Sequence, residues 1–362
     1  MKSIQTFFIT ITGLFSTAQT KKNLIQVRDE ANYSYFQASV NDLLTYDIMN
    51  LTQYKKHLYQ KFLVALTEQD KMQIISYYRC NKDAHFENKL ENILQDISIQ
   101  DTQIGYTYMP NKSKKQWHVN FADQHLFGFY HTNLFAQDEI QCAEHPLLSH
   151  VRAAAEYLGK KVAPLTIEDG PTPILIKDIH RLGVVNVMPT NENNYGLYGN
   201  NFARANLKYI DSMSQKIVND KYLTNFIAMA ALGYGSGTYK YDEIKFLFQT
   251  AKSSFSLAKE LSEGMEVELH TGNWGCGAFG NNRQLIASIQ LFAAHLSGIQ
   301  NVVYHTFDKE GKKGFDEGKK IYESFLRDIK INNCESPNFQ LDQQFIMFLT
   351  KQNFQWGYSD GN

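Results

Sequence analysis

The sequence predicts an α/β protein in which helices cover both faces of a mixed sheet. Strand-like apolar segments alternate with amphipathic helical segments over residues 225–307, an order typical of α/β/α layered domains. Before residue 105 the apolar residues follow helical spacing, and no proline occurs before Pro110, which indicates a helical region at the N-terminus. We therefore expect two parts, a helical accessory region at 1–105 and the α/β domain at 106–362.

The N-terminus has the outline of a secretory signal peptide over residues 1–18. One lysine precedes the apolar run Phe7–Phe15, and small residues follow it. Threonines within the run weaken this interpretation, and an amphipathic first helix or strand is the alternative. A nuclear or cytoplasmic location is favoured, with secretion as the second option. The run is too short to cross a membrane as a helix, and no other segment of the sequence qualifies.

The accessory region is expected to contain three helices. Residues 42–49 and 58–66 carry apolar side chains at helical spacing, and residues 89–94 resemble a last helix before the core. A charged turn at 111–116 then leads to a short apolar strand around Val119.

The α/β domain is expected to continue from that strand through an uncharged aromatic loop to a helix that begins at Gln137. The later elements are predicted from turn residues, apolar runs and helical periodicity. They are turns at Pro164–Ile176, a buried strand at Gly183–Met188, a loop at Asn191–Asn200, a strand at Asn225–Leu232, a helix at Asp242–Glu263, a strand at Val267–His270, a helix at Arg283–Leu296, a strand at Asn301–Phe307, and covering helices at Phe315–Leu326 and Phe339–Thr350.

The composition argues against several classes of function. Acidic and basic residues nearly balance, 37 against 36, so broad electrostatic binding to nucleic acid or to a membrane is not expected. The four cysteines are far apart and form no C-x-x-C pair, so neither a zinc site nor a disulfide framework is implied. Five histidines occur between His118 and His150, but none of them form the helical H-x-x-x-H pair of a metal site.

Two adjacent carboxylates follow the aromatic loop, at Asp138 and Glu139. Burial among apolar residues disfavours the charged form, so at least one is expected to keep its proton near neutral pH. A carboxyl group that gives and retakes a proton is what acid–base chemistry on a glycosidic bond requires. The alternative is that both residues are N-terminal helix charges that complement the helix dipole.

A glycine-rich segment lies far along the chain, at His270–Gly280. Four glycines, one tryptophan and one phenylalanine within eleven residues suit a loop whose backbone comes close to a ligand. Because this segment follows a predicted strand, it is expected at the carboxyl end of that strand, where ligands bind in such sheets.

Both segments resemble the signatures of the poly(ADP-ribose) glycohydrolase family. Thr271–Gly280 reads T-G-N-W-G-C-G-A-F-G and matches the first ten positions of the family's second signature. Asn120–Ile140 aligns without a gap with the first signature, which is D-F-A-N, three glycines and Q-E-E-I. The resemblance covers about residues 117–308. It implies a macrodomain with a helical accessory region, so that residues 106–362 are the expected catalytic domain with a helical C-terminal cover.

The resemblance implies an enzyme that reverses ADP-ribosylation, a process linked to the DNA damage response. It would hydrolyse the ribose–ribose O-glycosidic bonds of poly(ADP-ribose) and release ADP-ribose, with no cofactor and no metal. Glu139 would be the general acid and then the general base, Asp138 would hold a ribose hydroxyl, and Gln137 would orient the loop. The implied partners are poly(ADP-ribose), ADP-ribose and ADP-ribosylated proteins. The alternatives are an inactive ADP-ribose-binding macrodomain and a scaffold whose aromatic loop binds a protein.

The resemblance also implies a set of ligand contacts around the two loops. Tyr198 matches the family's ligand-contacting tyrosine best, with Tyr195 as the alternate, and each aromatic has core or loop packing as its alternative role. The substrate-binding residues that the resemblance implies are Asn120, Asp123, Gly128, Gln137, Tyr198, Asn273, Gly277, Phe279 and Phe307.

The sequence departs from the family pattern at several of these positions. Phe127 and Phe129 stand where two loop glycines are expected, and a side chain there either enters the diphosphate channel or disfavours backbone conformations with φ > 0. Asp138 is one methylene shorter than the expected glutamate. Asn120 and Asp123 exchange the expected acid and amide.

Overall fold

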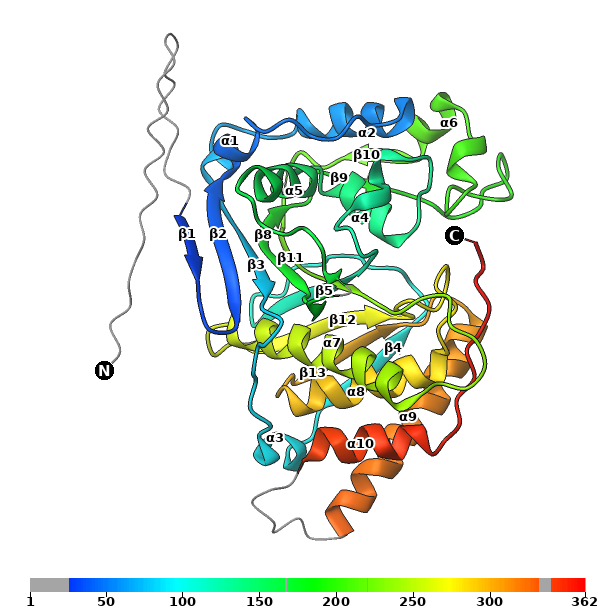
Figure 1. Ribbon diagram of the computed structural model, residues 1–362. Helices are drawn as coiled ribbons and strands as arrows, with labels where there is room; N and C mark the ends of the chain where they lie inside the picture. The colour runs from blue at the N-terminus through cyan, green and yellow to red at the C-terminus, as the bar shows by residue number, and fades with distance from the viewer. Residues whose placement is uncertain (1–25, 167, 220, 332–339, 362) are drawn as a thin grey trace.

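The computed structural model describes residues 26–361 except 167, 220 and 332–339 (Figure 1). Within these residues, nine strands form one mixed sheet in the order β1-β2-β3-β8-β11-β5-β12-β13-β4. Helices lie on both faces of this sheet, so the predicted fold class is confirmed. The strands of the main sheet are β1 (Gln26–Asp29), β2 (Tyr33–Ser39), β3 (Ile74–Cys80), β4 (Ser98–Thr102), β5 (Lys114–Ala122), β8 (Ile174–His180), β11 (Leu223–Ala230), β12 (Glu266–Gly272) and β13 (Asn301–His305).

Two small antiparallel sheets and a set of helices complete the described residues. The small sheets pair β6 (Leu165–Thr166) with β7 (Gly170–Pro171), and β9 (Gly183–Val185) with β10 (Ser214–Lys216). The α-helices are α1 (Val40–Leu43), α2 (Gln53–Leu63), α3 (Leu90–Leu94), α4 (Gln137–Glu144), α5 (Leu147–Tyr157), α6 (Leu207–Ser212), α7 (Tyr241–Glu260), α8 (Arg283–Leu296), α9 (Lys309–Ile331) and α10 (Leu341–Thr350). The 3₁₀ turns are η1 (Asp70–Met72), η2 (Gly128–His131) and η3 (Phe202–Arg204).

Five neighbouring strands of the main sheet run parallel, namely β11, β5, β12, β13 and β4. Their carboxyl ends therefore lie along one edge, and the loops that follow β5, β12 and β13 meet there although they are far apart in sequence. This edge receives the aromatic loop, the glycine-rich loop and Phe307.

The strand β5 sends alternate side chains into two different apolar layers, as a strand buried on both faces must. Trp117 and Val119 belong to the cluster that contains α7 and α8, whereas Ala122 belongs to the cluster on the opposite face. Asn120 is two residues before Ala122, so its side chain lies on the same face of the strand and faces α4. The register of this one strand thus decides which polar group reaches the carboxylates.

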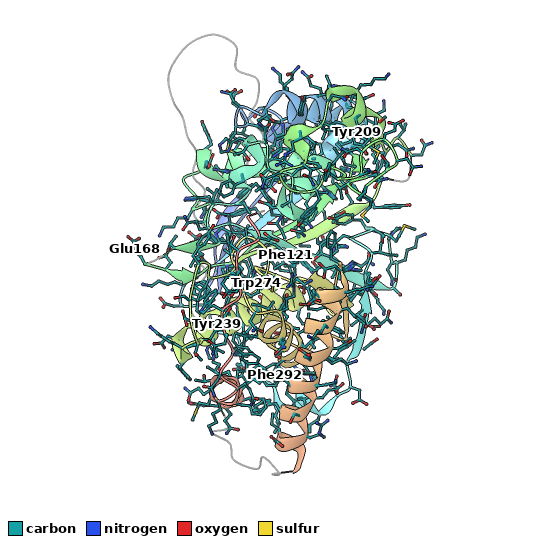
Figure 2. All side chains as sticks on the ribbon, turned by 90° about the vertical axis from the view of Figure 1, so that its right-hand side faces the viewer. Phe121, Glu168, Tyr209, Tyr239, Trp274 and Phe292 are labelled. Atoms are coloured by element: carbon teal, nitrogen blue, oxygen red, sulfur yellow. The ribbon has the colours of Figure 1, made fainter. Side chains whose placement is uncertain are left out.

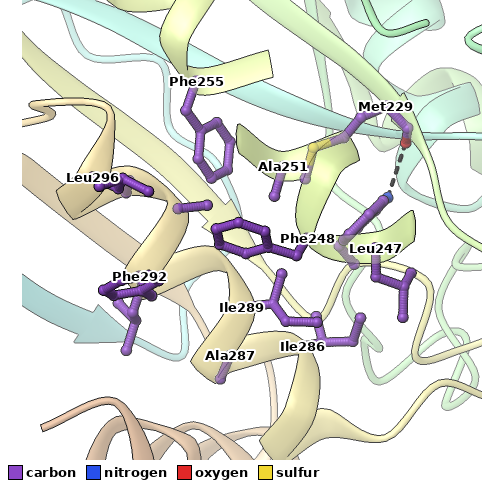
Figure 3. Packing of buried hydrophobic residues seen from close by; sticks show 14 of the residues in the cluster. Met229, Leu247, Phe248, Ala251, Phe255, Ile286, Ala287, Ile289, Phe292 and Leu296 are labelled. Carbon is purple, nitrogen blue, oxygen red and sulfur yellow. Dashed lines mark hydrogen bonds between the residues drawn. The ribbon is translucent and has the colours of Figure 1, made fainter. Parts of the chain in front are cut away.

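The layer built by α7, α8, α9 and α10 is packed with phenylalanine and aliphatic side chains (Figure 3). Phe292 of α8 is fully buried, and its ring centroid lies 4.2 Å from that of Phe345 and 5.1 Å from that of Phe325. The predicted helices at Asp242–Glu263 and Arg283–Leu296 are confirmed as α7 and α8 because their apolar residues recur at helical spacing.

The opposite layer contains α1, α2, α4 and α5, which lie above the sheet in Figure 1. Its apolar cluster includes Phe62 of α2, Cys142 of α4 and Leu148 of α5. The start of α4 is therefore enclosed between the sheet and α2.

The N-terminal region differs from the prediction of helices over residues 20–100. Helices are present at α1, α2 and α3, but α1 ends at Leu43, so the predicted helix at 42–49 was wrong over most of its length. The strands β1, β2 and β3 extend one side of the main sheet and β4 forms its other edge, so the prediction was wrong for these strands as well. The aromatic runs in β2 and β3 pack as cross-strand pairs, such as Phe36 stacked on Tyr77 at 4.9 Å, and this pairing outweighs helical spacing. The division of the chain at residue 105 stays a prediction.

The predicted buried strand at Gly183–Met188 contains only the short strand β9, which pairs with β10 outside the main sheet. The long buried strand is β8, which begins inside the region predicted as turns, Pro164–Ile176, and continues to His180. The outline of a signal peptide at residues 1–18 lies outside the described residues. Among the residues that are described, no helix is long and apolar enough to span a bilayer.

We predict that Phe292→Ala lowers the free energy of unfolding by about 3–5 kcal/mol, because it removes a fully buried ring and leaves a cavity. Urea unfolding followed by tryptophan fluorescence measures the change. Met347→Ala on α10, where the side chain is half exposed, is the control and should change stability by about 0.5 kcal/mol or less. Equal effects of the two substitutions would show that Phe292 is not central to this layer.

Candidate active site

The first turn of α4 is fixed to the end of β5 by the side chain of Gln137. Its Nε2 donates to the carbonyl oxygen of Val119 (2.9 Å), and its Oε1 accepts from the backbone N–H of Phe121 (2.9 Å). The amide therefore bonds the strand backbone as a neighbouring strand would. This contact places the next two residues of α4 directly over the carboxyl end of β5.

Asp138 and Glu139 are both buried, with 7% and 2% of their surfaces exposed. Asp138 Oδ1 accepts a hydrogen bond from Asn120 Nδ2 (2.8 Å), and the thiol of Cys142 is 3.8 Å from the same oxygen. Glu139 Oε2 accepts from the backbone N–H of Ala136 (2.9 Å), which is the residue before the helix. The pair thus has the burial predicted from the aromatic surroundings, and Glu139 also has the helix-capping contact of the alternative reading.

Burial raises the pKa of both carboxyl groups. For Asp138 burial and then the neighbouring Glu139 charge raise the pKa to about 8, against the opposing hydrogen bond from Asn120. For Glu139 burial raises the pKa, while the Lys55 ammonium and backbone N–H groups oppose the rise. Two adjacent acids in one buried site cannot both ionise easily, so the pair keeps a proton at neutral pH.

Asn120 is completely buried and links Asp138 to Gln141, a residue that the sequence analysis did not propose for the site. Its Nδ2 donates to Asp138 and also to Oε1 of Gln141, one turn farther along α4 (2.7 Å). The amide at this position therefore acts as a donor to the acid of α4. An acid here, as in the family pattern, would instead add a third carboxylate to the cluster.

The glycine-rich loop after β12 contains positions at which no side chain fits. A Cβ on Gly272 would lie 2.5 Å from the carbonyl oxygen of His305, and one on Gly275 would lie 2.5 Å from Cβ of Ala231. Gly275 also has φ of +68°, a conformation that favours glycine. Close packing and backbone geometry both explain the glycines that the sequence highlighted.

The two signature loops are close in space. Phe121, whose backbone N–H is held by Gln137, has its ring 3.4 Å from where a Cβ on Gly272 would lie. Figure 2 shows Phe121 just above Trp274 of the glycine-rich loop. The amide of Asn273 donates to the carbonyl oxygen of Thr306 (2.9 Å), so this side chain ties the loop after β12 to the end of β13.

Tyr198 connects the start of α4 with Phe307. The two rings have centroids 5.4 Å apart, and the side chain of Tyr198 interacts with the backbone of Gln137. Burial, followed by the charges of Asp360 and Glu139, raises the pKa of Tyr198 to about 12. Tyr195, the alternate, is 74% exposed, so the structure brings Tyr198 rather than Tyr195 to the carboxylates.

A pocket of about 500 Å³ opens beside this aromatic pair. Tyr198 and Phe307 form part of its wall, and Arg204 supplies a positive charge. Phe307 is half exposed where it lines this pocket, and its backbone has φ of +67°. The pocket has the aromatic and cationic character that a nucleotide requires.

The remaining predicted contacts lie around the same edge but farther from the carboxylates. Phe279 packs against Gly233 and Tyr234 in the loop after β11, with 5.8 Å between the rings of Phe279 and Tyr234. Asp123 accepts a hydrogen bond from the N–H of His125 (3.1 Å), and Gly128 lies next to both.

The two phenylalanines in place of loop glycines behave differently. Phe127 has φ of +53° and is 1% exposed, so its ring enters the apolar core and its backbone adopts the left-handed conformation, at a cost of about 1–2 kcal/mol. Phe129 is 46% exposed. Of the two consequences expected, backbone strain therefore applies to Phe127, and only Phe129 presents a ring to solvent.

The C-terminal segment lies along the glycine-rich loop, a contact that sequence reasoning missed. The N–H of Gly357 donates to the carbonyl oxygen of Gly280 (2.9 Å), and the N–H of Asp360 donates to the carbonyl oxygen of Gly277 (3.4 Å). An Asp360 carboxylate oxygen lies 3.2 Å from where a Cβ on Gly277 would be. In Figure 1 this segment rises from α10 past the ends of the strands. Its composition indicates only a loop, so no sequence signal pointed to the contact.

Lys55 was also missed. It lies on α2, is fully buried, and its Nζ donates to the carbonyl oxygen of Leu134 (2.5 Å) in the loop before α4. A signal was present, because Lys55 precedes Leu58 and Phe62 by three and seven residues and therefore lies on the apolar face of the helix.

The histidines form no metal centre among the residues that the structure describes, where no group of three or more His, Cys, Asp or Glu side chains is placed to hold an ion. His118 is stacked on His270 at 4.4 Å between ring centroids, and burial lowers the pKa of His118 well below its usual value.

Comparison with known proteins identifies a family over part of the chain. Residues 175–313 match the family described as poly (ADP-ribose) glycohydrolase (PARG), Macro domain fold. The matched range includes the glycine-rich loop, Tyr198 and Phe307, but not α4. Over 64 residues the chain is 39% identical to poly(ADP-ribose) glycohydrolase 1 of Arabidopsis thaliana. That match spans 12% of the length of the relative and 16% of this chain.

Several solved structures are similar to this chain at low sequence identity. A poly(ADP-ribose) glycohydrolase from Thermomonospora curvata bound to the inhibitor ADP-HPD is 15% identical, with a TM-score of 0.44. The alignment covers 74% of this chain and 99% of that one. A poly(ADP-ribose) glycohydrolase from Deinococcus radiodurans in complex with ADP-ribose is 12% identical, with a TM-score of 0.37 and coverage of 76% and 93%.

The raised pKa of Asp138 predicts a pH-dependent stability. The folded protein keeps a proton that the unfolded chain releases above about pH 4, so the stabilisation is complete below pH 4 and is lost as pH rises toward 8. Asp138→Asn keeps an oxygen that can accept from Asn120 but cannot ionise. We predict that its stability relative to wild type grows by on the order of 5 kcal/mol between pH 4 and pH 8.

Thermal unfolding at a series of pH values measures this difference. Asp83→Asn, at an exposed loop position, is the control and should follow the wild-type curve throughout. Parallel curves for wild type and Asp138→Asn would mean that Asp138 ionises normally in the folded protein.

Proposed function

We propose that this chain, whose residues 175–313 match the poly(ADP-ribose) glycohydrolase family, hydrolyses ribose–ribose O-glycosidic bonds in poly(ADP-ribose) and releases ADP-ribose. The observation that carries the proposal is the buried Asp138–Glu139 pair at the carboxyl edge of the parallel strands. Burial supplies a protonated carboxyl group at neutral pH, and the neighbouring loops supply aromatic and glycine-rich surfaces for an ADP-ribose unit.

In the proposed reaction Glu139 acts first as an acid. Its proton goes to the ribose oxygen of the leaving unit while the bond between that oxygen and the anomeric carbon breaks. Water then attacks the oxocarbenium-like carbon, and its proton passes to the Glu139 carboxylate, which restores the starting state. Asp138, one residue earlier, would accept a hydrogen bond from a ribose hydroxyl and orient the sugar.

The other residues hold the substrate in this scheme. The backbone around Gly275 and Gly277 would approach the diphosphate, since glycine allows close contact and free N–H donors. Tyr198 and Phe307 would bind the adenosine side of the unit, next to the pocket that contains Arg204.

An ADP-ribose-binding protein without hydrolytic activity is the second candidate. The contact between Glu139 Oε2 and the N–H of Ala136 favours it, because a glutamate that caps a helix has a structural role of its own. The two candidates predict the same binding but differ in turnover.

We predict that Glu139→Gln lowers the rate of poly(ADP-ribose) hydrolysis by about 10²–10⁴-fold, the usual contribution of general acid–base catalysis. Glutamine keeps an oxygen for the N–H of Ala136, so the fold and the affinity for ADP-ribose should persist, with Kd changed by less than about threefold. Hydrolysis of automodified polymer and calorimetric titration with ADP-ribose measure the two quantities. Glu310→Gln, on the exposed first turn of α9, is the control.

The outcomes separate the candidates. Loss of turnover in Glu139→Gln alone supports the enzyme. Stable polymer with both wild type and variant, together with ADP-ribose binding, would support the inactive reader. No binding by either protein would contradict both proposals.

We also predict that Asp360→Asn strengthens ADP-ribose binding. The carboxylate lies beside Gly277, where the diphosphate is proposed to approach, and like charges repel. Because the segment is exposed to solvent screening, the gain should be about three- to tenfold in Kd at low salt and smaller at high salt. Calorimetry at two ionic strengths measures it, with Asp83→Asn as the control. Weaker binding by Asp360→Asn would show that this carboxylate assists the ligand instead.

A further inference from the structure

Lys55 is a fully buried lysine on α2, a helix that the proposed reaction does not use. A cation with no exposed surface is costly unless hydrogen-bond acceptors or opposite charges surround it. Its side chain shares the apolar face of α2 with Leu58 and Phe62, whereas its neighbour Lys56 is exposed. The burial of this ammonium therefore requires compensating contacts with other residues.

The ammonium is enclosed by the loop that leads into α4. Nζ donates to the carbonyl oxygens of Leu134 (2.5 Å) and Phe129 (3.4 Å), which lie at the two ends of one short segment. It also lies 5.1 Å from the ring centroid of Tyr130 and 6.0 Å from that of Phe135. These two carbonyl contacts and two aromatic rings hold the loop before α4 against Lys55.

The segment 129–135, which Lys55 holds, leads directly into the candidate active site. Phe135 exchanges backbone hydrogen bonds with Gly199, next to Tyr198, and Ala136 donates its N–H to Glu139. A shift of the segment 129–135 would therefore move the tyrosine loop and the capping contact of the proposed acid together. This chain has Phe127 and Phe129 where the family pattern has flexible glycines, and Lys55 bonds the backbone next to them.

The same ammonium is the basic group that acts on the carboxyl pair. Burial lowers the pKa of Lys55 to about 8, and the charges of Glu139, Cys142 and Asp138 oppose that fall. In return Lys55 lowers the pKa of both carboxyl groups against the effect of burial. The other titratable groups that face the pair are Asp123, from the loop after β5, and Tyr198.

We propose that Lys55 is a positioning residue for the candidate active site, which holds the 129–134 backbone in place and supplies the counter-charge behind Asp138 and Glu139. The proposal rests on the proposed function for its catalytic meaning. When Glu139 gives up its proton, an anion forms inside the protein, and the fixed ammonium stabilises that anion. Without the ammonium, Glu139 is a weaker acid and keeps its proton to a higher pH.

Lys55→Met tests the proposal, because methionine fills a similar space without charge or donors. Lys56→Met, on the same helix but exposed, is the matched control. Carboxyl ¹³C NMR of labelled glutamate, with Glu139→Gln to assign the signal, follows the titration of Glu139 directly. We expect the Glu139 pKa to rise by about one unit or more in Lys55→Met and to stay unchanged in Lys56→Met.

Kinetics give a second readout that a purely structural role would not move. For polymer hydrolysis, Lys55→Met should lower kcat by about tenfold with little change in KM, and should shift the pH profile to higher pH. If the variant fails to fold, Lys55→Gln carries the test, since glutamine can still donate to Leu134 and the loss of charge alone should raise the Glu139 pKa.

The outcomes are distinguishable from failure of the proposed function. An unchanged Glu139 titration in both Lys55 variants, or a lower kcat with an unshifted pH profile, overturns the proposal. If wild type shows no hydrolysis, the proposed function fails, whereas the NMR titration still decides whether Lys55 sets the charge of the carboxyl pair.

Discussion

The structure depends on keeping two adjacent carboxyl groups out of water at the end of β5. Two hydrogen bonds and one positive charge make this burial tolerable. Asp138 accepts from Asn120, Glu139 accepts from the N–H of Ala136, and the charge of Lys55 lowers the pKa of both carboxyl groups. These interactions do not fully offset the loss of hydration, so the pair retains a proton, as the raised pKa values of both groups indicate. The same condition that makes the pair costly for folding makes it suitable for proton transfer.

The sheet explains why the remaining parts assemble there. Parallel strands end at one edge, so the loop after β5, the glycine-rich loop after β12 and Phe307 after β13 meet although more than 150 residues separate the first from the last. The alternation along β5 sends Asn120 toward α4 while Trp117 and Val119 anchor the opposite layer. One strand thus connects the apolar core to the polar site.

The sequence predicted the parts whose signals are local. The periodicity of α7 and α8, the glycines of the loop after β12 and the aromatic surroundings of Asp138 and Glu139 are all visible within short windows. It did not predict β1, β2 and β3, whose aromatic residues acquire strand character through partners in other strands. Lys55 and Asp360 were missed because their roles come from contacts with residues about 80 positions away in the chain.

The central claim is that Glu139 reaches the distal ribose of an ADP-ribose unit bound across the glycine-rich loop. A crystal structure of the protein with ADP-ribose tests it most directly. The account predicts a carboxyl oxygen of Glu139 within about 2.6–3.2 Å of the distal ribose, with the diphosphate against the Gly277 backbone. ADP-ribose bound with its distal ribose away from α4, or with Glu139 still bonded only to Ala136, would contradict it.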